Sequence, residues 1–236
     1  MNKIIKRGLI ILSSIVILIA VIVVVMFIKQ VIVDNRINDD ISSIYSADKY
    51  RISVSVNGIE VIKQNISCGY ACLELLARWQ DKNITEQSLF DQNNGKITTA
   101  MGNGFVNEAS KQFPELSFKK HTNLKNTELL DKTYDSLKNG MPVPFEFAAL
   151  YTEEGKNVWT LHFAIITAMD IQNDSITISN PYGYAETYSL NDFLRATRYE
   201  SYENMEFYFK LGFAAGLFSK NTIYIIRNSR IFSHPQ

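Results

Sequence analysis

An uninterrupted apolar segment near the N-terminus constrains this chain more than any other feature of its sequence. Residues 8–28 read GLIILSSIVILIAVIVVVMFI and contain neither a charged residue nor a proline. A helix needs roughly 20 such residues to cross the hydrocarbon core of a bilayer. The run is longer than the apolar part of a typical signal peptide, and no small-residue cleavage pattern follows it. We expect an uncleaved transmembrane signal anchor at 8–28; a long signal peptide that is removed is the alternative.

Basic residues on either side of this segment predict its orientation. The N-terminal amine, Lys3, Lys6 and Arg7 precede it. Two basic residues follow it, diluted by three aspartates: Lys29, Arg36, Asp34, Asp39 and Asp40. The positive-inside rule therefore predicts a single-pass protein of the cell membrane, with residues 1–7 as a cytoplasmic tail and the rest of the chain extracytoplasmic.

The remainder divides into a short linker and one domain. Residues 29–49 are polar and of mixed charge, as expected for a juxtamembrane stalk. Residues 50–236 are enough chain for a single domain with a sizeable core. The 24 basic and 24 acidic side chains cancel, so no charge excess indicates a nucleic-acid partner.

The first half of the domain reads mainly as helices. Alternating residues around Asn57-Gly58 predict a β-hairpin over 51–64. A helix over 68–80, with Ser67 as its N-cap, follows. Further helices are predicted at 86–91, 103–113 and 128–138, the last capped by Thr127.

The second half reads mainly as strands. Strands are predicted at 141–150, at 161–170 and 175–180 joined by a turn, and at 221–228. Prolines near the start of the first of these suggest an edge strand. Helices are expected after Ser189, with Asp192 three residues on, and within 205–218. Helices followed by mostly antiparallel strands indicate an α+β fold in which a helical half packs on an antiparallel sheet.

Cys68 is a candidate nucleophile because it stands at the predicted start of a helix. Free backbone N–H groups and the helix dipole stabilise a thiolate there, which would lower the thiol pKa. Gly69 leaves room for a substrate backbone. The competing interpretation is an ordinary buried cysteine. Cys72, one turn further on, is expected to be core packing, since a disulfide between i and i+4 would strain the helix.

A cysteine nucleophile needs a base, and His162 is the best placed of three histidines. His234 lies in the C-terminal tail, and His121 follows two lysines in a polar stretch. His162 opens an apolar strand. If 161–169 pairs with 175–180 about a turn centred near 171, Asn180 lies opposite His162 and its side-chain oxygen can orient the ring. Asn180 is equally explained as part of an NPYG turn.

Acyl transfer also needs an oxyanion hole, for which the Cys68 backbone N–H and the Gln64 side-chain amide are candidates. Spacing alone favours an ordinary surface role for Gln64. A metal site of Cys68, Cys72 and His162 would lack a fourth ligand, so neither a metal nor another cofactor is expected.

Together these motifs resemble the papain-like cysteine peptidases, and among them the bacteriocin-processing, double-glycine-leader peptidase family and its stand-alone relatives. The matching pieces are Gln64, SCGYA from residue 67, NGMPV from residue 139, LHFAIIT from residue 161 and NPYG from residue 180. The resemblance covers most of residues 60–185. It implies a papain-like fold with Cys68 as nucleophile, His162 as general base and acid, Asn180 as the orienting residue and Gln64 as oxyanion donor.

Three positions depart from the family pattern. Gln64 precedes Cys68 by four residues where many relatives have about six, Tyr70 stands where Pro is common, and Asn180 stands where many relatives carry Asp. Leader processing by exporters takes place on the cytoplasmic side, so an extracytoplasmic domain is not expected to trim leaders.

The sequence therefore predicts a membrane-anchored thiol hydrolase that cleaves a peptide or amide bond outside the cytoplasmic membrane. Its expected partners are a peptide or protein substrate and, through the N-terminal helix, membrane lipid. Two alternatives use the same residues: an acyl transferase or transpeptidase, and a papain-like binding module without catalytic activity.

Overall fold

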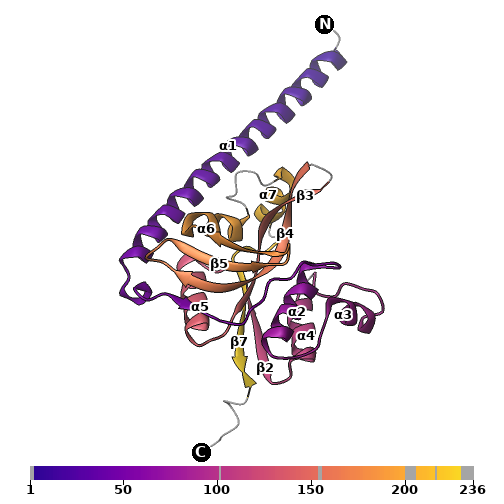
Figure 1. Cartoon of the computed structure of the whole chain (residues 1–236). Coiled ribbons are helices and arrows are strands. Elements are labelled where there is room, and N and C mark those ends of the chain that lie inside the picture. Colours follow the sequence, from indigo (N-terminus) through magenta and orange to yellow (C-terminus); the bar gives the residue numbers. More distant parts are fainter. Residues whose placement is uncertain (1–2, 101, 154–155, 200–205, 216, 230–236) are drawn as a thin grey trace, which may run out of the picture.

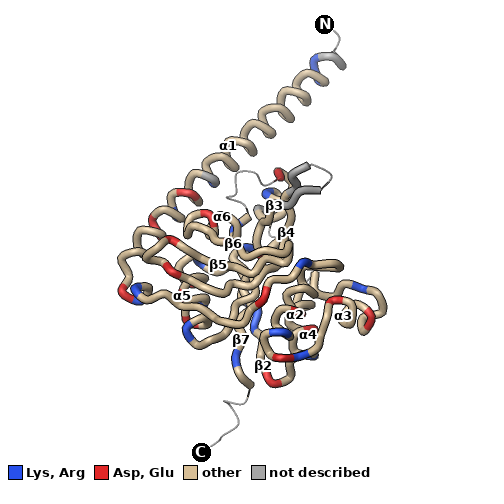
Figure 2. The backbone as a smooth tube through the Cα atoms, viewed as in Figure 1, with Lys and Arg blue, Asp and Glu red and all other residues tan. Residues whose placement is uncertain are grey.

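A computed structural model describes residues 3–100, 102–153, 156–199, 206–215 and 217–229 (Figure 1). Helix α1 (Lys3–Ser46) projects from a domain built on a single sheet. The apolar side chains of its N-terminal half are exposed, and no Lys, Arg, Asp or Glu interrupts that stretch in Figure 2. Among the described helices it is the one long and apolar enough to cross a membrane, a test that a signal sequence also passes.

The C-terminal part of α1 belongs to the folded domain. Val33, Ile37 and Ile44 are buried in the same core as the sheet. Asp34 forms a 3.2 Å ion pair with Arg195. The segment 29–49, which the sequence suggested as a stalk, is thus mostly a continuation of α1 that packs on the domain and ends in a short 3-10 helix, η1 (Asp48–Tyr50).

The described strands form one seven-stranded sheet in which all pairs are antiparallel. Its main path runs β2-β7-β3-β4-β5-β6, and β1 pairs with β4. The bounds are β1 (Val54–Ser55), β2 (Leu116–His121), β3 (Val143–Glu153), β4 (Lys156–Asp170), β5 (Ser175–Asn180), β6 (Tyr184–Tyr188) and β7 (Thr222–Asn228).

Helices cover both faces of the sheet (Figure 1). On one face lie α2 (Cys68–Trp79), α3 (Glu86–Gln92) and α4 (Gly104–Gln112); on the other lie α5 (Asn126–Lys138), α6 (Leu190–Arg198) and the end of α1. Side chains alternate along β4, so Phe163 and Ile165 join the α2 core, whereas Ala164 and Ile166 join the α5 core. The predicted α+β class, with helices on an antiparallel sheet, is confirmed.

The hairpin predicted around Asn57-Gly58 is wrong. Val54 pairs with Met169 of β4, and the chain after Gly58 forms no partner strand. The reason lies in β4. Val143, the first residue of β3, pairs with Ile166, so the β4 residues after Ile166 have no partner in β3. Segment β1 fills that edge, and Val56 N–H donates to Thr167 O at 2.8 Å.

Smaller corrections concern β3 and α5. Strand β3 is an interior strand between β7 and β4 rather than an edge; Pro144 is tolerated because the ladder with β7 begins one residue later, at Phe145. Helix α5 begins at Asn126 instead of 128, so Thr127 is not its cap. Strands β2 and β6 had no counterpart among the predicted elements. The remaining helix, α7 (Phe207–Ala214), lies within the predicted 205–218 segment.

Candidate active site

Cys68 is the first residue of α2, as predicted. The Ser67 side chain accepts a hydrogen bond from Tyr70 N at 3.2 Å and so caps the helix. The start of the helix is packed tightly, because a Cβ at Gly69 would lie 2.2 Å from Thr99 Oγ1. Glycine at 69 therefore lets α2 lie against the Thr99 side chain, and this close approach fixes the position of the preceding cysteine.

The environment of the Cys68 thiol has opposing effects on its pKa. Burial raises the pKa, backbone N–H groups of Phe163, Gly69 and Cys68 itself lower it, and the Glu146 carboxylate raises it. The balance lies above the ordinary value. The expected lowering by the helix N-terminus is therefore outweighed by desolvation, and the resting group is a neutral thiol. Such a thiol needs a base at the moment it attacks.

His162 and Asn180 are in direct contact, as predicted. His162 Nε2 lies 3.0 Å from Asn180 Oδ1, and both side chains are buried. The Tyr182 ring stacks on the imidazole, with centroids 4.1 Å apart. Burial lowers the pKa of His162 to about 4, although the Asn180 hydrogen bond raises it. The ring is therefore neutral near pH 7 and able to accept a proton.

The strand register behind this contact differs from the predicted one. Ile165 pairs with Ser179 and Ile166 with Ile178, so extending the ladder places Tyr182, not Asn180, opposite His162. The turn occupies residues 171–174, further along than assumed, and a bulge between Ile166 and Ala168 shifts the pairing again. Asn180 is a diagonal neighbour on the same face, which is still within reach of a side-chain hydrogen bond.

Two further contacts determine which His162 nitrogen carries the proton. Asn180 Nδ2 donates to Glu186 Oε2 at 2.9 Å, and Asn180 Oδ1 accepts from Tyr182 N at 3.0 Å. An ionised carboxylate only accepts and a backbone N–H only donates, so the amide has one favourable orientation. The oxygen then faces the ring, and Nε2 must be the donor. Nδ1 keeps its lone pair and is the nitrogen able to take a proton.

The Cys68 thiol lies next to the backbone of β4. The Phe163 N–H that acts on the Cys68 thiol belongs to the residue directly after His162. Strand β5 does not pair with β4 at this point, because the ladder between the two strands starts at Ile165. The start of α2 therefore lies beside the backbone of His162, where β4 has no β5 partner.

Gln64 reaches the same region through its backbone. Gln64 N donates to Pro181 O at 2.7 Å, and Lys63 bridges to Tyr182. This places Gln64 beside the segment that carries Asn180. Its side-chain Oε1 is buried and has no hydrogen-bond partner among the described residues.

Glu86 supports the candidate site, and the sequence reasoning did not identify it. Its carboxylate accepts the backbone N–H groups of Asn65, Ile66 and Ser67 at 2.9–3.0 Å, and its own N–H donates to Glu74 Oε2. The side chain is almost fully buried. Glu86 therefore fixes the turn that connects Gln64 to Cys68; an acidic residue in a first helical turn is too common a signal to reveal this role.

The other candidate residues lie elsewhere. Cys72 is fully buried in the α2 core, and burial raises its thiol pKa well above the ordinary value. His121 is the last residue of β2 and pairs with Ile223. His234 lies outside the described residues.

Comparisons with known proteins give a family and a structural likeness. The sequence model described as Peptidase_C39 like family matches residues 56–208, which include all four candidate site residues. Among solved structures, the chain is similar to one described as "Crystal structure of a double glycine motif protease from AMS/PCAT transporter in complex with the leader peptide", with 12% identity and a TM-score of 0.44, over 75% of this chain and 99% of that chain. No curated protein matches the chain.

Proposed function

The chain belongs to the Peptidase_C39-like family, and from that premise we propose that it is a membrane-anchored thiol hydrolase. It cleaves a peptide or amide bond outside the cytoplasmic membrane. The observation that carries the proposal is the contact between His162 Nε2 and Asn180 Oδ1, which leaves Nδ1 of a neutral ring as the proton acceptor.

The chemistry begins with a neutral pair. As the Cys68 sulfur attacks the substrate carbonyl carbon, its proton passes to His162 Nδ1, and Asn180 holds the resulting imidazolium through Nε2–H. The Cys68 backbone N–H and the Gln64 side-chain amide are the proposed donors to the oxyanion. His162 then protonates the leaving amine, which departs and leaves a thioester on Cys68.

The second half restores the enzyme. Water enters where the amine departed and gives a proton to His162 Nδ1 as its oxygen attacks the thioester carbonyl. The C–S bond breaks, the proton returns to the Cys68 sulfur, and a carboxylic acid is released. An amine in place of water would give a new amide, so analysis of products formed with added amines separates hydrolysis from acyl transfer.

The proposed location follows from α1. Its exposed apolar segment is long enough to span a bilayer, and the flanking basic residues favour a cytoplasmic N-terminus. In this arrangement the substrate is a peptide or protein that reaches the outer face of the membrane.

Thiol labelling and peptide cleavage of the full chain in detergent micelles test the proposal. We expect iodoacetamide to modify wild type but not Cys68→Ala, with Cys72→Ala, at a fully buried cysteine, as the matched control that still labels. Cleavage of a mixed peptide library, followed by mass spectrometry, should be lost in both Cys68→Ala and His162→Ala. Equal labelling of wild type and Cys68→Ala would rule out Cys68 as the nucleophile.

A further inference from the structure

Helix α7 and the turn after it expose a group of large apolar side chains, here called the α7 patch. Its members are Phe207, Tyr208, Leu211, Leu217 and Phe218. Tyr208 is 61% exposed and Leu217 77% exposed. Contiguous apolar surface of this kind is uncommon on soluble domains and indicates a protein or membrane contact.

The length of α1 between bilayer and domain places the domain at the membrane surface. If residues 8–28 span the bilayer, as the proposed function holds, the apolar segment ends at Ile28, and Val33 is already buried in the domain core. Five helical residues rise only about 7.5 Å. The polar headgroup layer on each side of the hydrocarbon is itself roughly 5–7 Å thick. Any part of the domain that extends past Val33 toward the N-terminus of α1 must therefore enter that layer.

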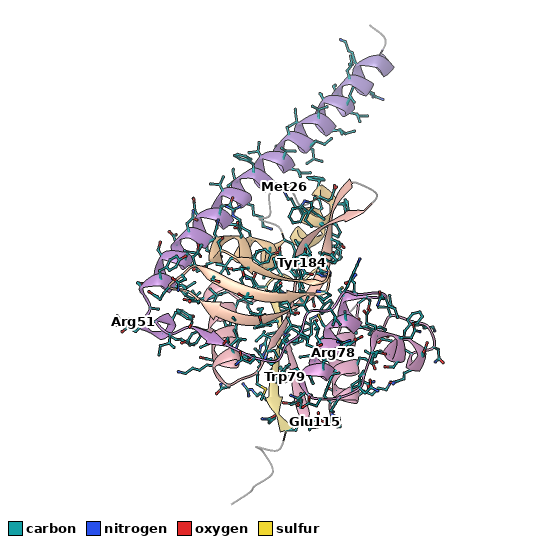
Figure 3. All side chains as sticks on the ribbon, viewed as in Figure 1. Met26, Arg51, Arg78, Trp79, Glu115 and Tyr184 are labelled. Carbon is teal, nitrogen blue, oxygen red and sulfur yellow. The ribbon has the colours of Figure 1, made fainter. Side chains whose placement is uncertain are left out.

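The contacts of α1 fix which part this is. Ile37 and Ile44 are buried, and Asp40 accepts a hydrogen bond from Asn126 at 2.9 Å, so the helix is held against the domain along its C-terminal part. Figure 1 shows α7 at the end of the domain toward which the N-terminal half of α1 extends. Met26, labelled in Figure 3, is partly buried, whereas the other described side chains from Lys6 to Lys29 are exposed.

We propose that the α7 patch inserts into the boundary between headgroups and acyl chains of the leaflet next to the domain, as a second membrane contact beside α1. A lipid surface fits better than a protein partner because α1 already directs this side of the domain toward the bilayer. Phe and Tyr side chains at the headgroup level are typical of interfacial contacts, and Leu side chains add buried apolar area.

Helix α7, which carries the patch, packs against the strand that carries His162. Phe209 and Phe213, on the inner side of α7, pack with Leu161 and Ala148. Leu161 directly precedes His162 on β4. Membrane contact through α7 therefore holds the catalytic strand next to the bilayer, where a substrate emerging from the membrane would be presented.

Nitroxide labelling of the full chain in phosphatidylcholine/phosphatidylglycerol nanodiscs tests this contact. Single cysteines are introduced as Tyr208→Cys in the patch, Leu18→Cys in the apolar segment and Ile97→Cys in the α3–α4 loop, all in a Cys68→Ala background that retains the buried Cys72. Power-saturation electron paramagnetic resonance measures accessibility to oxygen, which partitions into lipid, and to a nickel chelate, which stays in water. Thermal unfolding checks that each variant is folded, and Phe207→Cys serves as a second patch position.

We expect positions 18, 207 and 208 to favour oxygen and Ile97→Cys, at an exposed apolar residue on the other side of the domain, to favour nickel. Lipid exposure at 18 together with water exposure at 207 and 208 overturns the α7 contact while the anchor stands. Water exposure at 18 instead refutes the anchor on which the inference rests. Dipolar broadening between labels at 208 that disappears on dilution with unlabelled protein would assign the patch to a second copy of the chain and also overturn the proposal.

Discussion

Replacing Asn180 by Asp should destabilise this protein, although Asp is the residue that many related peptidases carry. In wild type, Asn180 Nδ2 donates to Glu186 Oε2 at 2.9 Å. Asn180→Asp puts a carboxylate oxygen in the place of that donor, so two acceptors face one another at hydrogen-bond distance. The expected penalty therefore depends on Glu186.

The magnitude follows from two bounds. Two unit charges about 3 Å apart repel by roughly 5–6 kcal/mol at an effective dielectric constant near 20. The pair can avoid this by holding one proton, and keeping a carboxyl with a pKa of about 4.3 protonated at pH 7 costs roughly 3.7 kcal/mol. Rotation of the half-buried Glu186 toward solvent lowers the penalty further. We expect a loss of about 2–4 kcal/mol of unfolding free energy at pH 7, which corresponds to a fall in Tm of about 4–16 °C for a domain of this size.

Thermal unfolding in detergent micelles measures this loss of stability as a double-mutant cycle. The four proteins compared are wild type, Asn180→Asp, Glu186→Gln and the double variant. The double variant should recover most of the stability, since the amide introduced by Glu186→Gln can donate to the carboxylate introduced by Asn180→Asp. Asn180→Asp alone should regain stability as the pH falls from 7 toward 5, because the folded carboxylate pair then binds a proton that the unfolded chain does not.

The outcome that refutes the reasoning is additivity. If the double variant is no more stable than the sum of the single changes predicts, within about 0.5 kcal/mol, Glu186 does not set the chemistry at position 180. An unchanged Tm for Asn180→Asp would lead to the same conclusion. Either result would also remove the reason for assigning the Nε2–H tautomer from the Glu186 contact.

Three further predictions concern the start of α2 and the base. The rate at which iodoacetamide modifies Cys68 should fall as the pH drops through about 4, the pKa to which burial lowers His162, rather than through 6.5. The unfolded chain protonates this ring below about 6.5 and the folded chain only near 4. The free energy of unfolding should therefore also fall by up to about 3 kcal/mol as the pH drops across that window, and by less in His162→Gln. Glu86→Gln should lower the free energy of unfolding by about 2–4 kcal/mol and slow Cys68 alkylation, since an amide cannot accept three N–H bonds as a carboxylate does. Chemical denaturation measures the first effect and labelling rates the second, and unchanged values would contradict the role of Glu86. Gly69→Ala should lower Tm through its clash with Thr99, and Thr99→Gly in the same chain should restore part of the loss; an unaltered Tm for Gly69→Ala would count against the tight packing of α2.

The elements that the sequence predicted well are those whose signals are local. Ser67 caps α2 and Ser189 caps α6 because a side-chain oxygen two or three residues before a backbone N–H is a property of the sequence itself. The register around His162 is not local in this sense. It depends on where the turn after β4 falls and on a bulge that shifts pairing by one residue, and neither can be read from alternation. The contact with Asn180 was predicted although its register was not, because side chains two residues apart on one strand share a face.

The failed hairpin has the same physical origin. Asn57-Gly58 is a good turn sequence, and Gly58 does adopt a φ of +83°. The preference of this sequence for a hairpin is nevertheless outweighed by the pairing of β1 with β4. Without the two residues of β1, this edge of β4 would carry unpaired backbone groups. A preference worth a fraction of a kcal/mol loses to such buried groups, each of which costs roughly 1–3 kcal/mol when unpaired.

The short gap between Gln64 and Cys68 is best understood through Glu86. Three consecutive N–H groups converge on this single carboxylate, so the chain between the two residues is a compact turn rather than an extended loop. One end of that turn is held by the Gln64 bond to Pro181 and the other by the start of α2. A four-residue gap can therefore connect the backbone beside Asn180 to the nucleophile position without extra length. The short spacing depends on the buried Glu86, which lies about twenty residues later and holds the turn compact. For this reason neither feature could be interpreted alone in the sequence.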